Sequence, residues 1–200
     1  MCGIAAIIDP AGAARLSDLR GMTEAIRHRG PDSEGYAVMT PQGVLRLSGP
    51  DTTNEGTVVP APFLPTQRVE SAGTPLGWAA LSQRRLSIID LSPMGHQPMC
   101  DPSGRYWIVF NGEIYNYVEL RRDLERRGHT FFGHSDTEVL IAAFAEWDRP
   151  FLDRLIGMFA FVLLDTQSRR LLIARDRFGI KPVYAWRMQN RAWAFASEIK

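Results

Sequence analysis

Cys2 is the residue with the clearest chemical potential in this chain. If Met1 is removed, the mature chain begins with a thiol and a free α-amine on the same residue. The ordinary pKa of an α-amine is about 7.7–8.0, which suits a general base near neutral pH. The thiol is intrinsically nucleophilic and needs only a nearby proton acceptor. Cys2 is therefore a candidate nucleophile that carries its own base, and the same position also fits a packing cysteine or a lipidated one.

A second candidate lies in the segment Phe110-Asn111-Gly112-Glu113. An Asn-Gly pair at the end of a strand is typical of a tight hairpin turn. The same pair also offers a side-chain amide and an adjacent backbone N–H, and two such donors suit the oxyanion of an acyl-transfer reaction. A glycine there lets a substrate approach the backbone closely. The local sequence leaves both interpretations open.

Charged residues that complement an amino acid form a third group. The guanidinium of Arg85 can bind a carboxylate through two parallel hydrogen bonds, and the carboxylates of Glu113 and Asp136 can pair with an ammonium. An amino-acid substrate carries both of these groups. Taken singly, each residue is more typical of a solvated charge or a helix cap than of a binding site.

Composition and missing motifs exclude several other functions. Lys plus Arg is 23 and Asp plus Glu is 22, which argues against a basic surface for nucleic acid or membrane. No apolar run approaches the ~18 residues of a membrane span. The four histidines have no cysteine partners at ligand spacing, and no phosphate-binding glycine loop is present, so neither a metal site nor a nucleotide site is predicted. The two cysteines form no Cys-x-x-Cys pair, and a cytoplasmic location is expected.

The elements that must position these residues follow from hydrophobic periodicity and from turn residues. Helices are expected over residues 17–28, from Asn116 to before Gly128, and from Ser135 to about Trp147, where Ser135 and Glu138 have the capping-box pattern. The stretch 43–77 is rich in proline and is expected to be irregular. Strands are expected at 3–8, 86–89, 106–110, 158–164, 171–175, 183–186 and 192–196. Strands that pair locally around central helices favour an α+β fold with largely antiparallel sheet.

An ordered series of motifs connects these features along nearly the whole chain, apart from roughly residues 46–76. The series is Met1-Cys2-Gly3-Ile4, Arg27-His28-Arg29-Gly30-Pro31-Asp32, Arg85-Leu86-Ser87-Ile88-Ile89-Asp90-Leu91, Gly95-His96-Gln97-Pro98, Phe110-Asn111-Gly112-Glu113-Ile114-Tyr115-Asn116, Ser135-Asp136-Thr137-Glu138, Gly157-Met158-Phe159-Ala160-Phe161 and Ala174-Arg175-Asp176-Arg177-Phe178-Gly179-Ile180-Lys181-Pro182. It resembles the glutaminase domain of glutamine-hydrolysing asparagine synthetases, a class II glutamine amidotransferase domain.

The resemblance implies a fold and a set of roles. The fold is the N-terminal-nucleophile hydrolase, a four-layer α/β/β/α sandwich of two antiparallel sheets, here one domain over residues 1–200 with a long loop at about 46–76. Cys2 is the implied nucleophile, and Asn111 and Gly112 form the oxyanion hole. The implied substrate-binding residues are Arg85 for the α-carboxylate, Glu113 and Asp136 for the α-ammonium, and Leu86 and Ile88 beside them.

The implied reaction is hydrolysis of L-glutamine through a γ-glutamyl thioester, with the ammonia passing to a synthetase domain or subunit that amidates aspartate. No cofactor is expected for this step. ATP and Mg²⁺ belong to the synthetase domain, whose signature is absent before Lys200, so the chain resembles a piece of a longer protein. A homodimer is among the expected assemblies.

Three alternatives remain open at this point. The ammonia acceptor is a sugar or another carboxylate, the enzyme is an acylase of the same superfold, or the chain binds glutamine or a partner without turnover. The charges at Arg85, Glu113 and Asp136 argue against a hydrophobic acyl group. Two departures from the family stand out, namely the length of the 46–76 stretch and Gln83, which stands where the family often has His.

Overall fold

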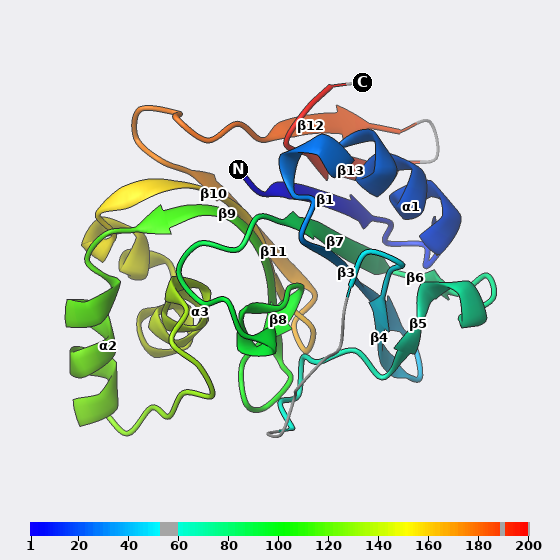
Figure 1. Cartoon of the computed structure of the whole chain (residues 1–200). Helices are drawn as coiled ribbons and strands as arrows, with labels where there is room; N and C mark the ends of the chain where they lie inside the picture. Colours follow the sequence, from blue (N-terminus) through cyan, green and yellow to red (C-terminus); the bar gives the residue numbers. More distant parts are fainter. Residues whose placement is uncertain (53–59, 189–190, 200) are drawn as a thin grey trace.

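The computed structural model describes residues 1–52, 60–188 and 191–199. Two β-sheets stack face to face, with helices on their outer sides (Figure 1). Helix α1 (Leu16–Ala25) packs on the larger sheet, whereas α2 (Tyr117–Arg126) and α3 (Asp136–Trp147) lie on the side of the smaller one. This arrangement is the predicted α+β sandwich.

Within the described residues, the larger sheet has seven strands and the smaller sheet has four. In spatial order the larger sheet contains β12 (Tyr184–Arg187), β13 (Trp193–Ala196), β1 (Gly3–Ile8), β7 (Ala79–Arg85), β3 (Ser33–Thr40), β4 (Gly43–Ser48) and β5 (Gln67–Arg68). The smaller sheet contains β11 (Arg170–Arg175), β10 (Gly157–Asp165), β9 (Tyr106–Ile114) and β8 (Met99–Cys100). A separate two-stranded sheet joins β2 (Ala14–Arg15) and β6 (Leu76–Gly77). Short 3₁₀ turns lie at Arg27–Arg29, Val69–Ser71, Pro93–Gly95 and Arg149–Arg154.

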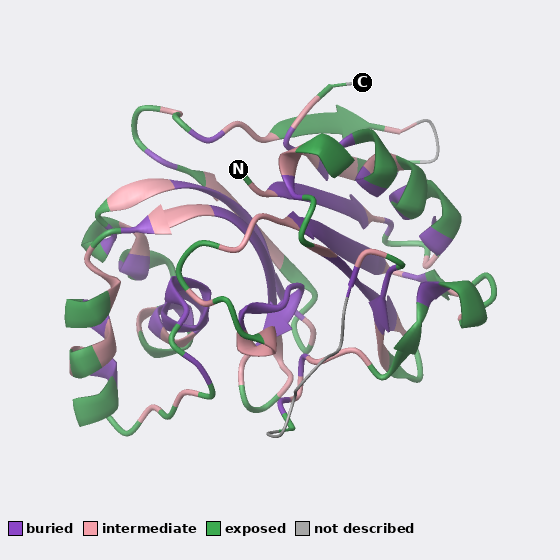
Figure 2. Cartoon of the chain, in the orientation of Figure 1, coloured by how far each residue is buried: buried purple, intermediate pink, exposed green. Residues whose placement is uncertain are grey.

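Strand β1 shows why the two sheets stack. Its side chains alternate between two hydrophobic clusters, because successive residues of a strand point to opposite faces. Ile4 and Ala6 belong to the cluster between the sheets, whereas Ala5 and Ile7 pack toward α1. Both faces of the strand are therefore covered, and Figure 2 shows β1 and β7 as buried ribbons inside an exposed shell.

Helix α3 begins where the capping pattern predicts. The Ser135 hydroxyl accepts the backbone N–H of Glu138 at 3.2 Å. The Glu138 carboxylate does not return to the cap residue, and it accepts the N–H groups of Phe132 and Gly133 instead. The carboxylate therefore fixes the loop that enters the helix, and the helix start is confirmed.

Strand β9 is longer than predicted and corrects one interpretation. It continues through Ile114, and Asn111 and Gly112 pair with Ala160 and Phe159 of β10. The hairpin-turn interpretation of the Asn-Gly pair is therefore wrong. Residues 106–110 are the apolar part of the strand, and the apolar pattern predicted only that part. Asn111, Gly112 and Glu113 interrupt the pattern because they line a cavity.

Other boundaries also differ from expectation. The first helix covers Leu16–Ala25 with Arg15 as its cap residue, so Ser17 is not the cap. Residues 86–89 form a loop after β7, and the predicted strand is wrong there. Asn116 precedes α2, but its side chain bonds the backbone of Arg154 and Ile156 rather than capping the helix.

The proline-rich stretch contains more regular structure than its composition indicates. Strand β4 occupies its beginning and pairs with β3, and β5 pairs with β4 in parallel, which departs from an all-antiparallel sheet. The backbone N–H of Thr66 donates to the Arg46 carbonyl, and this bond ties the returning segment to β4. Residues 53–59 of the predicted long loop lie outside the described residues.

Candidate active site

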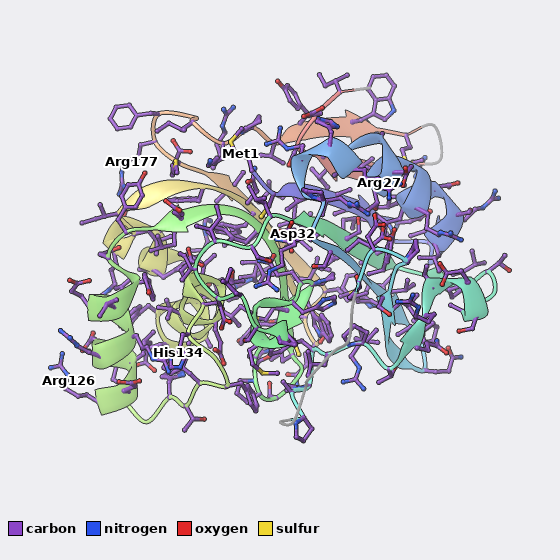
Figure 3. The ribbon with its side chains drawn as sticks, viewed as in Figure 1. Met1, Arg27, Asp32, Arg126, His134 and Arg177 are labelled. Atoms are coloured by element: carbon purple, nitrogen blue, oxygen red, sulfur yellow. The ribbon has the colours of Figure 1, made fainter. Side chains whose placement is uncertain are left out.

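A cavity of about 230 Å³ gathers the predicted site residues at one end of the sandwich. The start of β1, the end of β7 with its following loop, the end of β9 and the start of α3 meet there. Figure 3 shows Met1 beside the start of β1, where the chain enters this region. All eight predicted residues line the cavity, and they are Cys2, Arg85, Leu86, Ile88, Asn111, Gly112, Glu113 and Asp136.

The Cys2 thiol lies against the backbone of Leu86. Its Sγ is 3.4 Å from the Leu86 nitrogen and 3.5 Å from the Leu86 oxygen. Burial raises the pKa of the thiol, while the Leu86 N–H, the N-terminal ammonium and Arg85 oppose that shift. A thiol with a raised pKa is mostly protonated near neutral pH, so its reaction requires a base.

Met1 occupies part of the space next to this thiol. It lines the cavity, 56% of its surface is exposed, and its Sδ lies 3.1 Å from the Nζ of Lys181. While Met1 is present, the nitrogen of Cys2 is a peptide nitrogen without basicity. Removal of Met1 converts that nitrogen into an amine and enlarges the cavity at the same time.

Asn111 supplies a donor that lacks a partner. The residue is 1% exposed, and within the described residues its Nδ2 has no hydrogen-bond partner. An unsatisfied buried donor costs free energy, and such groups in native structures commonly mark a position that a ligand completes. The geometry therefore suits a ligand oxygen at this wall of the cavity.

The backbone of β9 directs a second donor to the same side. The N–H groups of Phe110 and Ile114 donate to the side chains of Gln97 and Asp136, at 2.7 and 3.0 Å. Backbone N–H groups alternate along a strand, so the N–H of Gly112, midway between them, points to the same side, away from β10. A Cβ at Gly112 would overlap the Met158 carbonyl, so glycine is required here by the approach of β10.

Arg85 is held by the loop that follows it. Its guanidinium donates to the carbonyls of Ser92, at 3.1 Å, and Asp90. Burial lowers the pKa of Arg85, and the neighbouring Asp90, Cys2 and Asp32 oppose this shift. Gly95 lies close to it, and a Cβ there would force the guanidinium to shift. A guanidinium has more N–H donors than these two contacts use, so donors remain for a carboxylate.

The acidic side of the cavity combines Glu113 with Asp136. Asp136 is the first residue of α3, and burial raises its pKa to about 6, with the Glu113 carboxylate adding to the shift and backbone N–H groups opposing it. Two neighbouring carboxylates in a confined space favour a cationic ligand, which relieves their repulsion. Ile88 lies at the rim of the cavity with 60% of its surface exposed.

Sequence comparison identifies the family. The model of the glutamine amidotransferase domain family matches residues 73–200. The chain belongs to this family. Asparagine synthetase [glutamine-hydrolyzing] 1 of Bacillus subtilis is 36% identical to this glutamine amidotransferase domain over the whole chain, and Amidase chry2 of Gibberella zeae is 34% identical over the whole chain. In both cases the chain spans 26% of the relative's length.

A solved structure confirms the fold of this glutamine amidotransferase domain. The glutamine phosphoribosylpyrophosphate amidotransferase of B. subtilis superposes with a TM-score of 0.75 at 20% identity, over 98% of this chain and 42% of that one. The predicted N-terminal-nucleophile hydrolase sandwich is therefore confirmed.

The structure adds residues to the site that the sequence did not single out for a role. Gln83, Gln97, Thr137, Met158 and Lys181 also line the cavity of this amidotransferase domain. Four of them belong to the ordered motifs, whereas Gln83 is one of the two departures. Motif membership is thus a usable signal, but no local pattern separates the cavity residues from the packing residues.

The described residues contain no group of His, Cys, Asp and Glu side chains that could hold a metal ion. Among them, no helix is both long and apolar enough to cross a bilayer. The cytoplasmic location stays a prediction.

Proposed function

We propose that this domain hydrolyses L-glutamine to glutamate and ammonia through a γ-glutamyl thioester on Cys2. The observation that carries the proposal is the unpartnered Asn111 Nδ2 at the same cavity as the Cys2 thiol. Nucleophile and oxyanion donor are the two parts that acyl transfer requires. The family membership and the relative named as a glutamine-hydrolysing asparagine synthetase support the substrate.

The first half of the reaction transfers the acyl group. With Met1 removed, the α-amine of Cys2 takes the thiol proton, and Sγ forms a bond to the side-chain carbonyl carbon of glutamine. The carbonyl oxygen receives the electron pair and is stabilised by Asn111 Nδ2 and the Gly112 N–H. The oxyanion then collapses, the C–N bond breaks, and the amine returns its proton to the leaving nitrogen, which departs as ammonia.

The second half regenerates the enzyme. Water attacks the thioester carbonyl while the same amine takes a proton from it. The second oxyanion uses the same two donors, and its collapse breaks the C–S bond. The sulfur recovers its proton from the amine, and glutamate leaves. The thiol proton that left with ammonia is thereby replaced by a proton from water, and the amine serves as base and acid in turn.

Substrate recognition is assigned to the charged walls of the cavity. Arg85 would bind the α-carboxylate of glutamine, and Glu113 with Asp136 would bind its α-ammonium. The guanidinium, the two carboxylates and the thiol line one cavity. A substrate that carries both charges is thereby distinguished from a simple amide.

The ammonia acceptor is proposed to be aspartate, on a synthetase domain or subunit that uses ATP and Mg²⁺. The name of the B. subtilis relative supports this choice. A second candidate is a different acceptor, such as a sugar or another carboxylate, because a relative of similar identity over the whole chain is named an amidase. No cofactor is assigned to the glutamine-hydrolysing step, and the homodimer stays a prediction.

The experiment measures ammonia release from glutamine by protein whose N-terminus is shown by intact mass to begin at Cys2. Cys2→Ala should abolish release, whereas Cys100→Ala is the matched control, because Cys100 is buried away from this cavity. Release by Cys2→Ala at the wild-type rate would refute the nucleophile. A correctly processed wild type that binds glutamine without releasing ammonia would support the non-catalytic alternative.

A further inference from the structure

The peptide groups of Phe110 are held by two glutamine side chains instead of a neighbouring strand. Strand β8 pairs Met99 with Ile108, so the next partner of Phe110 along the ladder is residue 97. Regular pairing ends there, because residue 98 is a proline and β8 begins at Met99. The Gln97 Oε1 accepts the Phe110 N–H at 2.7 Å, and the Gln83 Nε2 donates to the Phe110 carbonyl at 2.8 Å.

Both side chains are fixed by what they bind. Gln83 is 1% exposed and Gln97 is 6% exposed. A backbone N–H can only donate and a carbonyl can only accept, so each amide has one permitted orientation. Gln97 uses its remaining nitrogen to donate to Thr137 Oγ1 at 3.1 Å, next to Asp136 on α3. The two amides thus form a rigid clamp on Phe110, which we call the glutamine clamp (Gln83 and Gln97).

Gln83 also connects the two halves of the site. It lies on β7, where it pairs with Ile4 of β1, two residues after the thiol. Phe110 lies on β9 of the other sheet and directly precedes Asn111. The Gln83–Phe110 hydrogen bond is therefore a cross-link between the sheet that carries the nucleophile and the strand that carries the oxyanion donors.

We infer that the glutamine clamp is a positioning device, in which Gln83 sets the placement of the Asn111 and Gly112 donors relative to Cys2. The inference rests on the proposed function and extends it to residues that do not contact the reacting atoms. An oxyanion hole acts only when its donors meet the developing charge at hydrogen-bond distance, so a small displacement of β9 lowers the rate. Arg85 lies on β7 and Asp136 lies on α3, so a displacement of β9 should affect kcat more than the binding of glutamine.

The test replaces Gln83 with a side chain of similar length that cannot donate. Gln83→Met should lower kcat about 10-fold to 100-fold, which is less than the ~10²–10³ of deleting a donor, and should leave KM nearly unchanged. Gln83→His retains a ring donor and should restore part of kcat. Ser82→Ala is the matched control, because Ser82 is buried in the same strand and its hydroxyl bonds Thr23 on the other face.

A second measurement separates positioning from general damage to the fold. The Cys2 sulfur adds to the γ-aldehyde of glutamate to form a tetrahedral hemithioacetal. The oxygen of this adduct needs the same donors as the oxyanion of the transition state. Gln83→Met should weaken binding of this aldehyde by about the factor lost in kcat. Glutamine binding, measured in the Cys2→Ala background, should not change. Gln97→Met removes the other hydrogen bond of the clamp, the one to the Phe110 N–H. It takes the place of Gln83→Met if that variant does not fold.

The outcomes distinguish the inference from the function on which it rests. A processed wild type without ammonia release would overturn both. An active wild type whose Gln83→Met and Gln97→Met variants keep kcat would overturn the inference alone. Equal losses of kcat in Gln83→Met and Ser82→Ala, or a loss confined to KM, would also overturn it, because each would show a structural or a binding role.

Discussion

At the scale of single residues, Arg85 has two roles: it is proposed to bind the substrate, and it holds the loop that follows β7. Its guanidinium bonds the carbonyls of Ser92 and Asp90, so the loop that forms one cavity wall is closed by the residue that would bind the α-carboxylate. Any substitution of Arg85 therefore tests two roles at once. The two roles are separable because only one of them depends on the charge of the substrate.

Arg85→Ala should raise the KM for glutamine strongly, because truncating one partner of a buried carboxylate–guanidinium pair costs about 2–5 kcal/mol. For an analogue of glutamine that lacks the α-carboxylate, the same substitution should raise the KM much less. Arg85→Lys should recover only part of the loss, because an ammonium cannot reproduce the planar fork. Steady-state kinetics on both substrates checks this, and an equal loss on both would assign Arg85 to loop structure alone.

Asp136 predicts a pH dependence of glutamine binding. Its pKa of about 6 means that the carboxyl becomes neutral as the pH falls through that value, and its attraction for the substrate ammonium is lost. The dissociation constant of glutamine, measured by calorimetry in the Cys2→Ala background, should therefore rise below about pH 6. Asp136→Asn should bind weakly without that step. Glu113→Gln should move the step to lower pH, because the Glu113 carboxylate contributes to the raised pKa.

The contribution of Asp136 to the free energy of unfolding should have the opposite pH dependence, because it is largest at low pH. The pKa of Asp136 is raised in the folded state above the ordinary 3.8, so the folded state holds this proton more tightly than the unfolded chain. The resulting stabilisation is complete below about pH 4 and is lost as the pH rises through about 6. Asp136→Asn should thus be more stable than wild type above pH 6 only. A stability difference independent of pH would contradict the raised pKa.

At the scale of elements, strand β9 carries most of the chemistry, and its alternation organises the site. Its N–H groups at residues 110, 112 and 114 face the same side, where the outer two bond side chains and the middle one is directed to the cavity. The opposite edge of β9 is fixed by β10. Any change in the spacing of these two strands therefore reaches the donors directly.

Gly112→Ala should destabilise the fold and reduce ammonia release. The added methyl would overlap the Met158 carbonyl, and overpacking of this kind costs about 1–3 kcal/mol. Gly21→Ala is the matched control, because Gly21 lies in α1 with open space around its Cβ position and should gain up to about 1 kcal/mol. Urea unfolding of both variants measures this. A neutral Gly112→Ala would mean that β9 and β10 separate easily.

The sequence anticipated some elements well and others poorly, for physical reasons. Strand β1 and the start of α3 depend on local patterns, namely an apolar run and a capping serine, and both were predicted. The end of β9 was missed because its polar residues serve a cavity that only the fold creates. The apolar residues Ile88 and Ile89 led to a predicted strand at 86–89. The segment is a loop instead, and the Arg85 guanidinium closes it by donating to the carbonyls of Ser92 and Asp90. The partners of Phe110, on β7 and before β8, are distant in sequence and carried no local signal.

At the scale of the whole molecule, a buried ionic cluster joins three segments of the larger sheet. The Arg84 side chain is fully buried, and its guanidinium lies 2.8 Å from Glu34 on β3 and 2.6 Å from Asp51 after β4. It also donates to the carbonyl of Gly30. Arg84 and Arg85 therefore serve opposite faces of β7, one for the fold and one for the cavity, although they are adjacent in sequence.

Arg84→Met should lower the free energy of unfolding by about 3–5 kcal/mol, because it leaves the Glu34 carboxylate buried without its cation. The double variant Arg84→Met/Glu34→Gln should recover part of this loss, since no unpaired charge remains. Arg126→Met, at an exposed ion pair on α2, is the control and should change stability little. Urea unfolding checks the series, and a double variant less stable than Arg84→Met would contradict the explanation.

The position of Met1 in the cavity wall has a practical consequence for preparing the enzyme. An affinity tag fused ahead of residue 1 would place extra chain at the cavity and keep the Cys2 nitrogen acylated, so tagged material should be inactive whatever its purity. Strong overexpression that outpaces the host's methionine aminopeptidase would yield a mixture of trimmed and untrimmed chains. The specific activity of each batch should then scale with its trimmed fraction, and mass spectrometry of the intact protein becomes the natural way to count active sites.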